Sequence, residues 1–254
     1  MIDLHCHILP GVDDGPRELA VSVEMCRVAA GDGCTAMVAT PHQRHPSWPD
    51  LDRATFRAAF ERLREAVGDL LEIRLGAEVR VDSALVAELD AADPSFLSLA
   101  ESRYVLLELD RWGTGPEPED LIHEALVAGW IPVLAHPELI PVLATDLDRV
   151  TDLVSVGARL QVTAMCVTGE LGRPAERTVW EMLERDLVHF VSSDAHSPEW
   201  RPPGLEAARR LLASRLGDDV AQRLTVANPA RVLAGEPLEG AESPAGSRGE
   251  VRSR

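Results

Sequence analysis

Lysine is absent from the 254-residue chain, so all 25 of its basic residues are arginine. A lysine amine is needed by Schiff-base and PLP enzymes and by P-loop NTPases, where it reaches the phosphates. It is also needed by amidohydrolases that bridge two metals through a carboxylated lysine. The sequence therefore excludes all of these mechanisms.

Positive charge is scarce as well, because 42 acidic residues outweigh the 25 arginines and leave a net charge of −17. A protein that binds a nucleic-acid backbone needs a basic face, so we expect no nucleic-acid partner. No apolar run approaches the roughly 18 residues of a membrane-spanning helix. The first residues also lack the basic and apolar regions of a secretory signal. We expect a soluble, cytoplasmic protein that does not insert into a membrane.

The four cysteines form no CxxC pair and are too sparse for a disulfide framework, so we interpret them as reduced thiols. A cysteine phosphatase is identified by a Cys-x5-Arg spacing, in which the arginine binds the phosphate beside the nucleophilic thiolate. The residues found at that spacing are Val12, Asp32, Thr40 and Gly172, which excludes this mechanism.

Short apolar runs of strand length alternate with longer segments of helical period. The predicted strands are Ile2–His5, Thr35–Thr40, Leu71–Glu78, Tyr104–Leu109, Ile131–Ala135, Arg159–Thr163 and Val188–Ser193. The predicted helices include Glu18–Ala30, Leu51–Val67, Pro118–Gly129, Asp146–Val156 and Pro174–Arg185. Such alternation predicts an α/β fold with a parallel sheet, and seven units in one domain favour a TIM-like barrel.

The predicted elements also carry signals at their ends. Asp50 is a candidate N-cap, Pro118 opens a helix, and Gly129 and Gly157 match C-terminal glycines. From Gly235 onward the chain is rich in Gly, Pro, Ser and charge, which cannot offset the entropy of ordering. We expect one domain over residues 1–234 and a disordered, non-catalytic tail over residues 235–254.

Polar side chains stand where six of the predicted strands end. They are His5 and His7, His42, Glu78, Glu108, His136, and Asp194 and His196. The carboxyl ends of barrel strands meet on one face, so five of the eight histidines and three carboxylates would converge there. Packing them together without a cation would destabilise the fold by several kcal/mol, and metal binding would offset this loss. Imidazole with carboxylate favours Mn or Fe over structural Zn.

Each of these residues also fits a structural interpretation, such as a hydrogen-bonded histidine or an ion-paired carboxylate. That interpretation, however, must account for six strand ends at once. We assign no role to His45, His123 or His189. Asp13 and Asp14 form a further acid pair, although Asp-Asp-Gly is also an ordinary turn sequence.

The motifs resemble bacterial tyrosine-protein phosphatases of the CpsB/YwqE type, which belong to the PHP (polymerase and histidinol phosphatase) superfamily. The resemblance covers roughly residues 1–234. The segments that carry it are 5–16, Thr40-Pro41-His42, Gly76-Ala77-Glu78, Leu107-Glu108, Ala135-His136-Pro137-Glu138, Gln161, 169–172, Ser193-Asp194-Ala195-His196 and 201–205.

The resemblance implies a distorted (β/α)7 barrel of the PHP type and up to three divalent metals, usually Mn²⁺, with Fe, Zn or Mg as alternatives. It implies hydrolysis of phosphotyrosine on a protein, a bacterial tyrosine kinase that governs capsule or exopolysaccharide synthesis. Arg201 matches an arginine near the substrate phosphate. The metal ligands that it implies are His5, His7, Asp14, His42, Glu78, Glu108, His136, Asp194 and His196.

Charge supports a phosphate ester as the substrate. Three divalent ions and four carboxylates leave about +2 on the site, which complements a phosphomonoester. A metal-bound hydroxide would supply the nucleophile, and His196 or His42 would protonate the leaving group.

Two positions depart from the family pattern. Leu139 stands where an arginine is frequent, and Gln43 stands where a second histidine is frequent. Two alternatives to a protein-tyrosine phosphatase therefore remain. One is a PHP small-molecule phosphoesterase acting on histidinol phosphate or a nucleotide, and the other is a non-catalytic metal-binding scaffold for a kinase.

Overall fold

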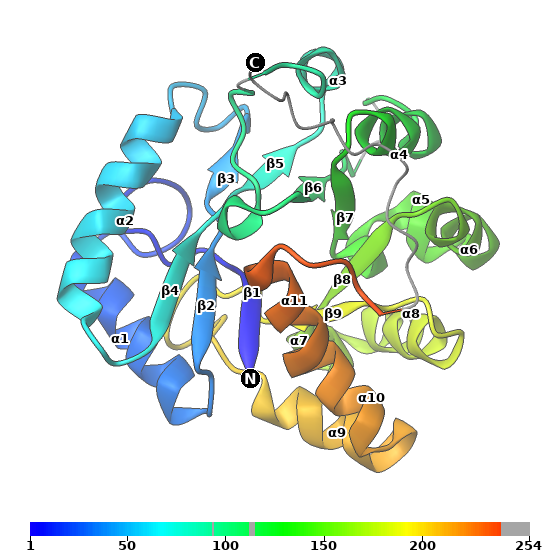
Figure 1. Cartoon of the computed structure of the whole chain (residues 1–254). Helices are drawn as coiled ribbons and strands as arrows, with labels where there is room; N and C mark the ends of the chain where they lie inside the picture. The colour runs from blue at the N-terminus through cyan, green and yellow to red at the C-terminus, as the bar shows by residue number, and fades with distance from the viewer. Residues whose placement is uncertain (93, 112–114, 240–254) are drawn as a thin grey trace, which may run out of the picture.

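The computed structural model describes residues 1–92, 94–111 and 115–239. Within this part of the chain, nine strands lie at the centre and helices surround them (Figure 1). The strands are β1 (Ile2–Cys6), β2 (Ala36–Ala39), β3 (His42–Gln43), β4 (Glu72–Leu75), β5 (Glu78–Arg80), β6 (Tyr104–Glu108), β7 (Ile131–Ala135), β8 (Arg159–Thr163) and β9 (Phe190–Ser192).

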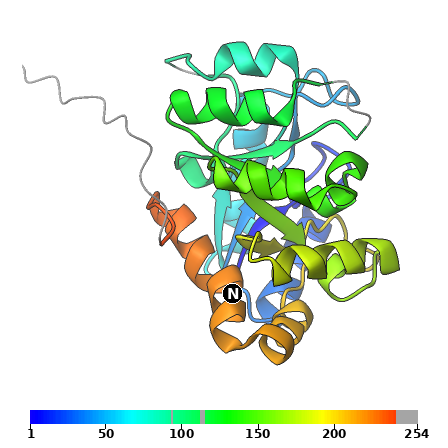
Figure 2. The ribbon, with the colours of Figure 1, turned by 90° about the vertical axis from the view of Figure 1, so that its right-hand side faces the viewer.

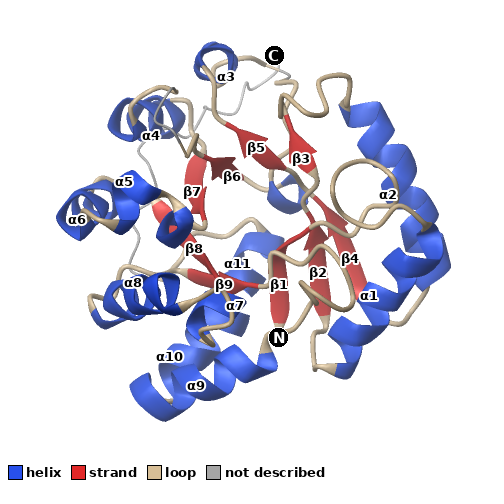
Figure 3. Ribbon diagram, turned by 180° about the vertical axis from the view of Figure 1, so that it is seen from behind, coloured by secondary structure: helices blue, strands red, loops and turns tan. Residues whose placement is uncertain are grey.

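The helices form the outer layer, as the view from behind also shows (Figure 3). They are α1 (Leu19–Gly31), α2 (Arg53–Val67), α3 (Ser83–Glu88), α4 (Pro118–Val127), α5 (Pro141–Ala144), α6 (Leu147–Ser155), α7 (Ala164–Val167), α8 (Arg173–Glu184), α9 (Glu206–Leu216), α10 (Asp218–Gln222) and α11 (Asn228–Ala234). Short 3₁₀ turns at Leu99–Glu101 and Pro137–Leu139 and a π-helical segment at Arg223–Ala227 complete them. On one side α4, α6 and α8 stack in sequence order over the strands (Figure 2).

Capping residues set the helix ends. Helix α2 begins later than predicted, because Asp52 rather than Asp50 accepts a hydrogen bond from the Thr55 backbone N–H at 2.8 Å. Gly129 and Gly157 follow α4 and α6 with φ of 87° and 121°, as expected for C-terminal glycines.

Strand pairing is parallel throughout the described residues and forms two sheets. Their strand orders are β1-β2-β4 and β3-β5-β6-β7-β8-β9. The single strand predicted over Leu71–Glu78 is wrong, because the chain breaks there into β4 and β5, one in each sheet. At the break, a Cβ on Gly76 would lie 3.1 Å from Val38 Cγ1 and 3.2 Å from Leu99 Cα. A larger residue would therefore require Val38 or Leu99 to shift by a few tenths of an ångström.

The last strand returns to the first. The Asp194 N–H donates to the His5 carbonyl and the His7 N–H donates to the Ala195 carbonyl, both at 2.8 Å. The segment after β9 therefore lies beside the end of β1. The parallel α/β prediction is confirmed, whereas a closed barrel of seven units stays a prediction.

The core has an inner and an outer layer. Alternate strand residues, such as Leu4, Leu106 and Val133, face inward and form a small apolar cluster. The intervening residues, such as Leu107 and Leu134, belong to the larger cluster beneath the helices. The inner cluster fills the space between the strands and leaves polar side chains at their carboxyl ends.

The first residues of the predicted tail pack against this core. The Tyr104 hydroxyl donates to the Glu236 carbonyl at 2.8 Å, and Leu238 is buried in the inner cluster. The rest of the predicted tail, residues 240–254, lies outside the described residues. None of the helices in the described ranges is long and apolar enough to cross a membrane.

Candidate metal centre

Of the nine predicted metal ligands, seven lie at or just after the carboxyl ends of strands or in the loop after β1, and two are the first residues of strands. His42 and Glu78 lie where β2 and β4 continue into β3 and β5, and they are register partners. The other positions are His5 at the end of β1, His7 and Asp14 after it, Glu108 at the end of β6, His136 after β7, and Asp194 and His196 after β9.

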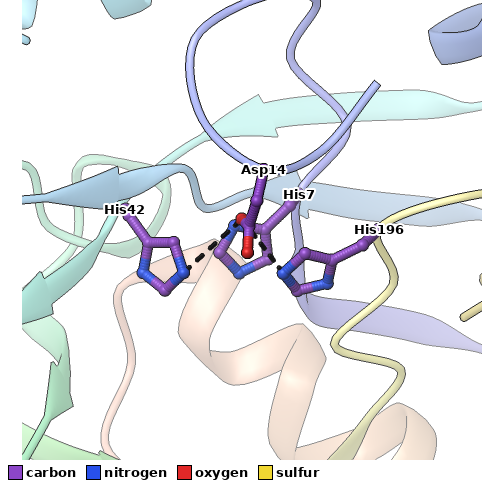
Figure 4. Close-up of side chains that lie close together, drawn as sticks. All are labelled: His7, Asp14, His42 and His196. Carbon is purple, nitrogen blue, oxygen red and sulfur yellow. Dashed lines mark ion pairs between the residues drawn. The ribbon is translucent and has the colours of Figure 1, made fainter. Parts of the chain in front are cut away.

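These side chains converge in four overlapping groups, within each of which the candidate ligand atoms lie within 4.8 Å of one another. One group is drawn in Figure 4, where His42 and His196 flank Asp14 and His7 lies between them. The Asp14 carboxylate is 3.6 Å from His42 Nε2 and 3.3 Å from His196 Nε2. The other groups are His5, Glu78 and His136; His5, His7 and Asp194; and His42, Glu78 and Glu108.

The Nε2 atoms of His5 and His7 are placed to bind a cation. The Nδ1 atoms of the same two rings contact Gln161 Oε1 at 2.7 Å and Asp13 Oδ2 at 2.8 Å, and both oxygens are hydrogen-bond acceptors. In the tautomer with Nδ1 protonated on each ring, the two Nε2 atoms lie 3.3 Å apart and direct their lone pairs into the same space. A cation there would accept both lone pairs, and outer partners of this kind orient metal-ligating histidines.

Other buried atoms of the site also lack partners. His42 Nδ1 and Glu78 Oε2 form an ion pair at 2.9 Å, but among the described residues Glu108 Oε2 and His136 Nδ1 are fully buried without a hydrogen bond. Each such atom costs about 1–3 kcal/mol unless something satisfies it. The donor set of imidazoles and carboxylates thus fits divalent cations.

Electrostatics in the cluster oppose a cation-free state. Burial lowers the pKa of His136, but the hydrogen bond to Glu78 and its charge outweigh burial and raise the pKa to about 9. Burial and the charge of Glu78 raise the pKa of Glu108. Without metal the carboxylates therefore hold protons on the site, which a divalent cation would displace.

Two candidate ligands have strained backbones. His136 and Asp194 adopt positive φ values of 35° and 52°, a region that non-glycine residues rarely occupy. Such strain persists only where the surrounding structure enforces it, and it concentrates at functional sites. Here it turns both side chains toward the cluster.

The cluster forms the floor of a cavity of about 370 Å³. Arg201 lines the cavity, and its Nη2 donates to Asp194. His45 also lines it and packs against His42 and Trp48, so it lies at the site although no role was predicted for it. His123 is exposed on α4, and His189 is half-buried outside the site, with its Nδ1 accepting from the Leu160 N–H.

Three further residues of the site have no role predicted from the sequence: Gln161, Asp13 and Arg80. Gln161 and Asp13 hold the rings of His5 and His7, and the acid pair at 13–14 was the available signal for the second. Arg80 lines the cavity, and its spacing of two from Glu78 in one strand was the signal for it. Gln43, by contrast, is structural, because it bonds to the Ser95 carbonyl and the Leu97 N–H.

Fold and site together define a parallel α/β protein with a histidine–carboxylate centre suited to several divalent cations. The family model described as "Capsular polysaccharide synthesis, CpsB/CapC" matches residues 1–234. The chain belongs to this family, and the predicted resemblance is confirmed.

The chain is similar in sequence to two proteins named as tyrosine-protein phosphatases. The chain is 31% identical over 227 residues to tyrosine-protein phosphatase YwqE of Bacillus subtilis, covering 89% of each chain. It is 30% identical over 240 residues to tyrosine-protein phosphatase CpsB of Streptococcus pneumoniae, covering 92% of this chain and 98% of the relative.

The chain is also similar to a solved structure described as "Crystal structures of YwqE from Bacillus subtilis and CpsB from Streptococcus pneumoniae, unique metal-dependent tyrosine phosphatases". Its TM-score is 0.87 at 31% identity, over 94% of this chain and 96% of the other. A lactonase from Listeria monocytogenes, at 12% identity and a TM-score of 0.56 over 93% of this chain and 95% of the other, shares the fold alone.

Proposed function

We propose that this chain is a metal-dependent phosphatase that removes phosphate from tyrosine residues of a protein. The observation that carries the proposal is the convergence of nine candidate metal ligands at one cavity, whose lining includes arginine. Membership of the CpsB/CapC family and likeness to YwqE and CpsB over most of their length support the same reaction.

The four overlapping groups would hold up to three divalent ions, with Mn²⁺ as our first choice and Fe, Zn or Mg as alternatives. His5, His7, His42 and Glu78 each belong to two groups, so neighbouring ions would share these residues. When bound, the ions would supply an activated water and positive charge for the phosphoryl oxygens.

The chain's own residues would bind and orient the ester. Arg201 retains donors beyond the one given to Asp194, and a guanidinium matches the geometry of phosphate oxygens. His42 and His196 flank Asp14 and would carry the proton for the leaving phenolate. A phenolate is a good leaving group, so its protonation lowers the barrier to hydrolysis only slightly.

We assign this activity to residues 1–234 as a single domain, with the two sheets as parts of one distorted (β/α)7 barrel. The substrate we propose is a bacterial tyrosine kinase of capsule or exopolysaccharide synthesis, in line with the description of the family. Action on such a kinase would place the protein in the cytoplasm, where the kinase meets ATP.

A second candidate is hydrolysis of a small phosphate ester, such as histidinol phosphate or a nucleotide. The observation that favours it is Leu139, an apolar residue of the cavity lining at a position where the family often has arginine. Comparing rates on phosphotyrosine peptides and on small alkyl phosphates separates the two candidates.

The test uses purified protein with Mn²⁺ and with excess chelator. We expect phosphate release from a phosphotyrosine peptide, its loss with chelator, and little release from an alkyl phosphate. A metal-loaded protein that is inert on every aryl phosphate would refute the proposal. Metal per chain is measured alongside by elemental analysis.

Two sets of variants refine this test. Glu108→Ala or His136→Ala should abolish hydrolysis, and a scaffold role toward a kinase would survive that loss. Arg201→Ala should raise KM or lower turnover with metal content unchanged. Loss of metal in that variant would move Arg201 to a structural role.

A further inference from the structure

Besides Arg201, the cavity is lined by Arg80 and Arg111, which the proposed reaction leaves unused, and of these two only Arg80 belongs to a strand. Arg80 is the last residue of β5, two positions after Glu78, so both side chains lie on the same face of the strand. Its side chain is 21% exposed and lines the cavity together with Arg201. Strands β6, β7 and β8 lie between β5 and β9, after which Arg201 follows (Figure 1). The two guanidinium groups thus reach one cavity from distant strands.

Arg80 is anchored at only one nitrogen. Its Nη2 donates to Asp110 Oδ1 at 2.7 Å, whereas its Nη1 stays 3.7 Å from Glu108 Oε2, beyond hydrogen-bonding distance. A guanidinium carries five N–H donors. Among the described residues, the remaining donors of Arg80 have no hydrogen-bond partner.

Arg44 shows how a purely structural arginine differs. It lies two residues after His42, as Arg80 lies two residues after Glu78, and His42 and Glu78 are register partners. Its Nη1 donates to Glu88 at 2.8 Å and its Nη2 to Asp82 at 2.9 Å, so carboxylates hold both ends. Arg44 lines a separate hollow beside the cavity. The fold can therefore hold both terminal nitrogens of an arginine at this spacing, but it holds only Nη2 of Arg80 by a hydrogen bond among the described residues.

The charge of the cavity accounts for the difference. The lining contains carboxylates that metal ions would neutralise, and Glu108 is one of them. If Glu108 held a cation it would attract Arg80 less, and the hydrogen bond to Asp110 would keep the guanidinium in place. A phosphate monoester offers several anionic oxygens, and paired guanidinium and phosphate groups form strong charge-assisted hydrogen bonds.

We propose that Arg80 binds a non-bridging oxygen of the substrate phosphate opposite Arg201, so that the two arginines clamp the phosphate above the metal centre. This inference rests on the proposed phosphatase function and adds a substrate-binding residue to it. Asp110 is then the residue that positions Arg80.

The experiment measures inorganic phosphate binding to the full, Mn²⁺-loaded chain by titration calorimetry, and KM with an aryl phosphate. Arg80→Gln should weaken phosphate binding about 10–100-fold and raise KM more than it lowers kcat. Arg80→Lys should recover part of this loss, because an ammonium keeps the charge without the planar fork. Arg44→Gln is the matched control and should bind phosphate within about twofold of the wild type.

Metal content and melting temperature are measured for every variant. An Arg80→Gln variant with wild-type phosphate affinity overturns the proposal. So does one that loses metal, because Arg80 would then act through Glu108. If the wild-type chain binds phosphate but hydrolyses no aryl phosphate, the proposed phosphatase function is refuted. The two-arginine phosphate clamp is still supported in that case if Arg80→Gln binds phosphate less tightly than the wild type. A wild-type chain that binds no phosphate overturns both.

Discussion

Replacing Asp13 by asparagine should weaken metal binding while leaving the shape of the site unchanged. The Asp13 carboxylate is fully buried and accepts three hydrogen bonds, from His7 Nδ1 at 2.8 Å and from the Gly15 and His42 N–H groups at 3.0 Å. It thereby keeps the proton of His7 on Nδ1 and directs Nε2 into the cluster. It also holds the backbone of His42, a second candidate ligand.

The magnitude follows from these contacts. An amide keeps the volume of the carboxylate but loses its charge and one acceptor oxygen. A hydrogen bond to a charged group contributes about 1.5–3 kcal/mol, and about 1.4 kcal/mol corresponds to a factor of ten. Loss of an outer partner of a ligating histidine typically costs about 10–100-fold in metal affinity. We therefore expect Asp13→Asn to bind Mn²⁺ about 10–100-fold more weakly.

Competition with a chelator measures this affinity, and thermal unfolding of the metal-free protein checks that the fold is intact. Asp52→Asn is a matched control, because Asp52 caps α2 and is not among the candidate ligands. An Mn²⁺ affinity within twofold of the wild type would refute the reasoning. A metal-free melting temperature far below that of the control would show that Asp13 holds the loop together rather than orienting His7.

Three further predictions concern stability. Mn²⁺ at about 1,000 times its Kd should stabilise the fold by about 4 kcal/mol and raise Tm by about 10 °C in calorimetry, an increase that chelator reverses; an unchanged Tm would contradict a site that binds metal only when folded. Burial and nearby Arg159 lower the pKa of His189 to about 3. As the pH falls below about 6.5, His189 is therefore protonated in the unfolded chain before it is protonated in the folded one, and the free energy of unfolding decreases. Between pH 6.5 and 4.5 the loss should be about 2 kcal/mol, and His189→Asn should remove it in urea titrations, whereas an identical pH slope would count against this assignment. Gly76→Ala should lower the unfolding free energy by about 1–3 kcal/mol, because its Cβ would press on Val38 and Leu99; equal urea midpoints would mean that the strand break absorbs the methyl group.

Much of the candidate site was accessible from the sequence, because strand ends are marked by local pattern. His5 and His7 close an apolar run, and His136 and Asp194 do the same, so their place in a parallel α/β fold follows from the order of the runs. Family motifs added Asp14, which spacing alone left undecided.

The break between β4 and β5 could not be predicted in this way. Residues 71–78 read as one continuous strand, and the break coincides with Gly76, which Val38 and Leu99 approach closely. Those contacts join segments far apart in the sequence. The short β3 was missed for a similar reason, since two residues carry no periodicity.

The difference between Asp13 and Asp14 shows the limit most directly. The two are adjacent and chemically identical, yet one side chain is buried against His7 and the other is 46% exposed beside His42 and His196. No local pattern distinguishes them. Arg80 and Arg44 are a second such pair, with equal spacing from neighbouring candidate ligands and different partners.

The sequence by itself determined the kinds of ligand, their order along the strands and the absence of any lysine-based chemistry, since these depend on residue type and local period. The tertiary structure alone decided which atoms face one another and which arginine stays open to the cavity. It did so because contacts between residues as distant as His5 and Asp194 arise only when parallel strands pair and their loops pack together.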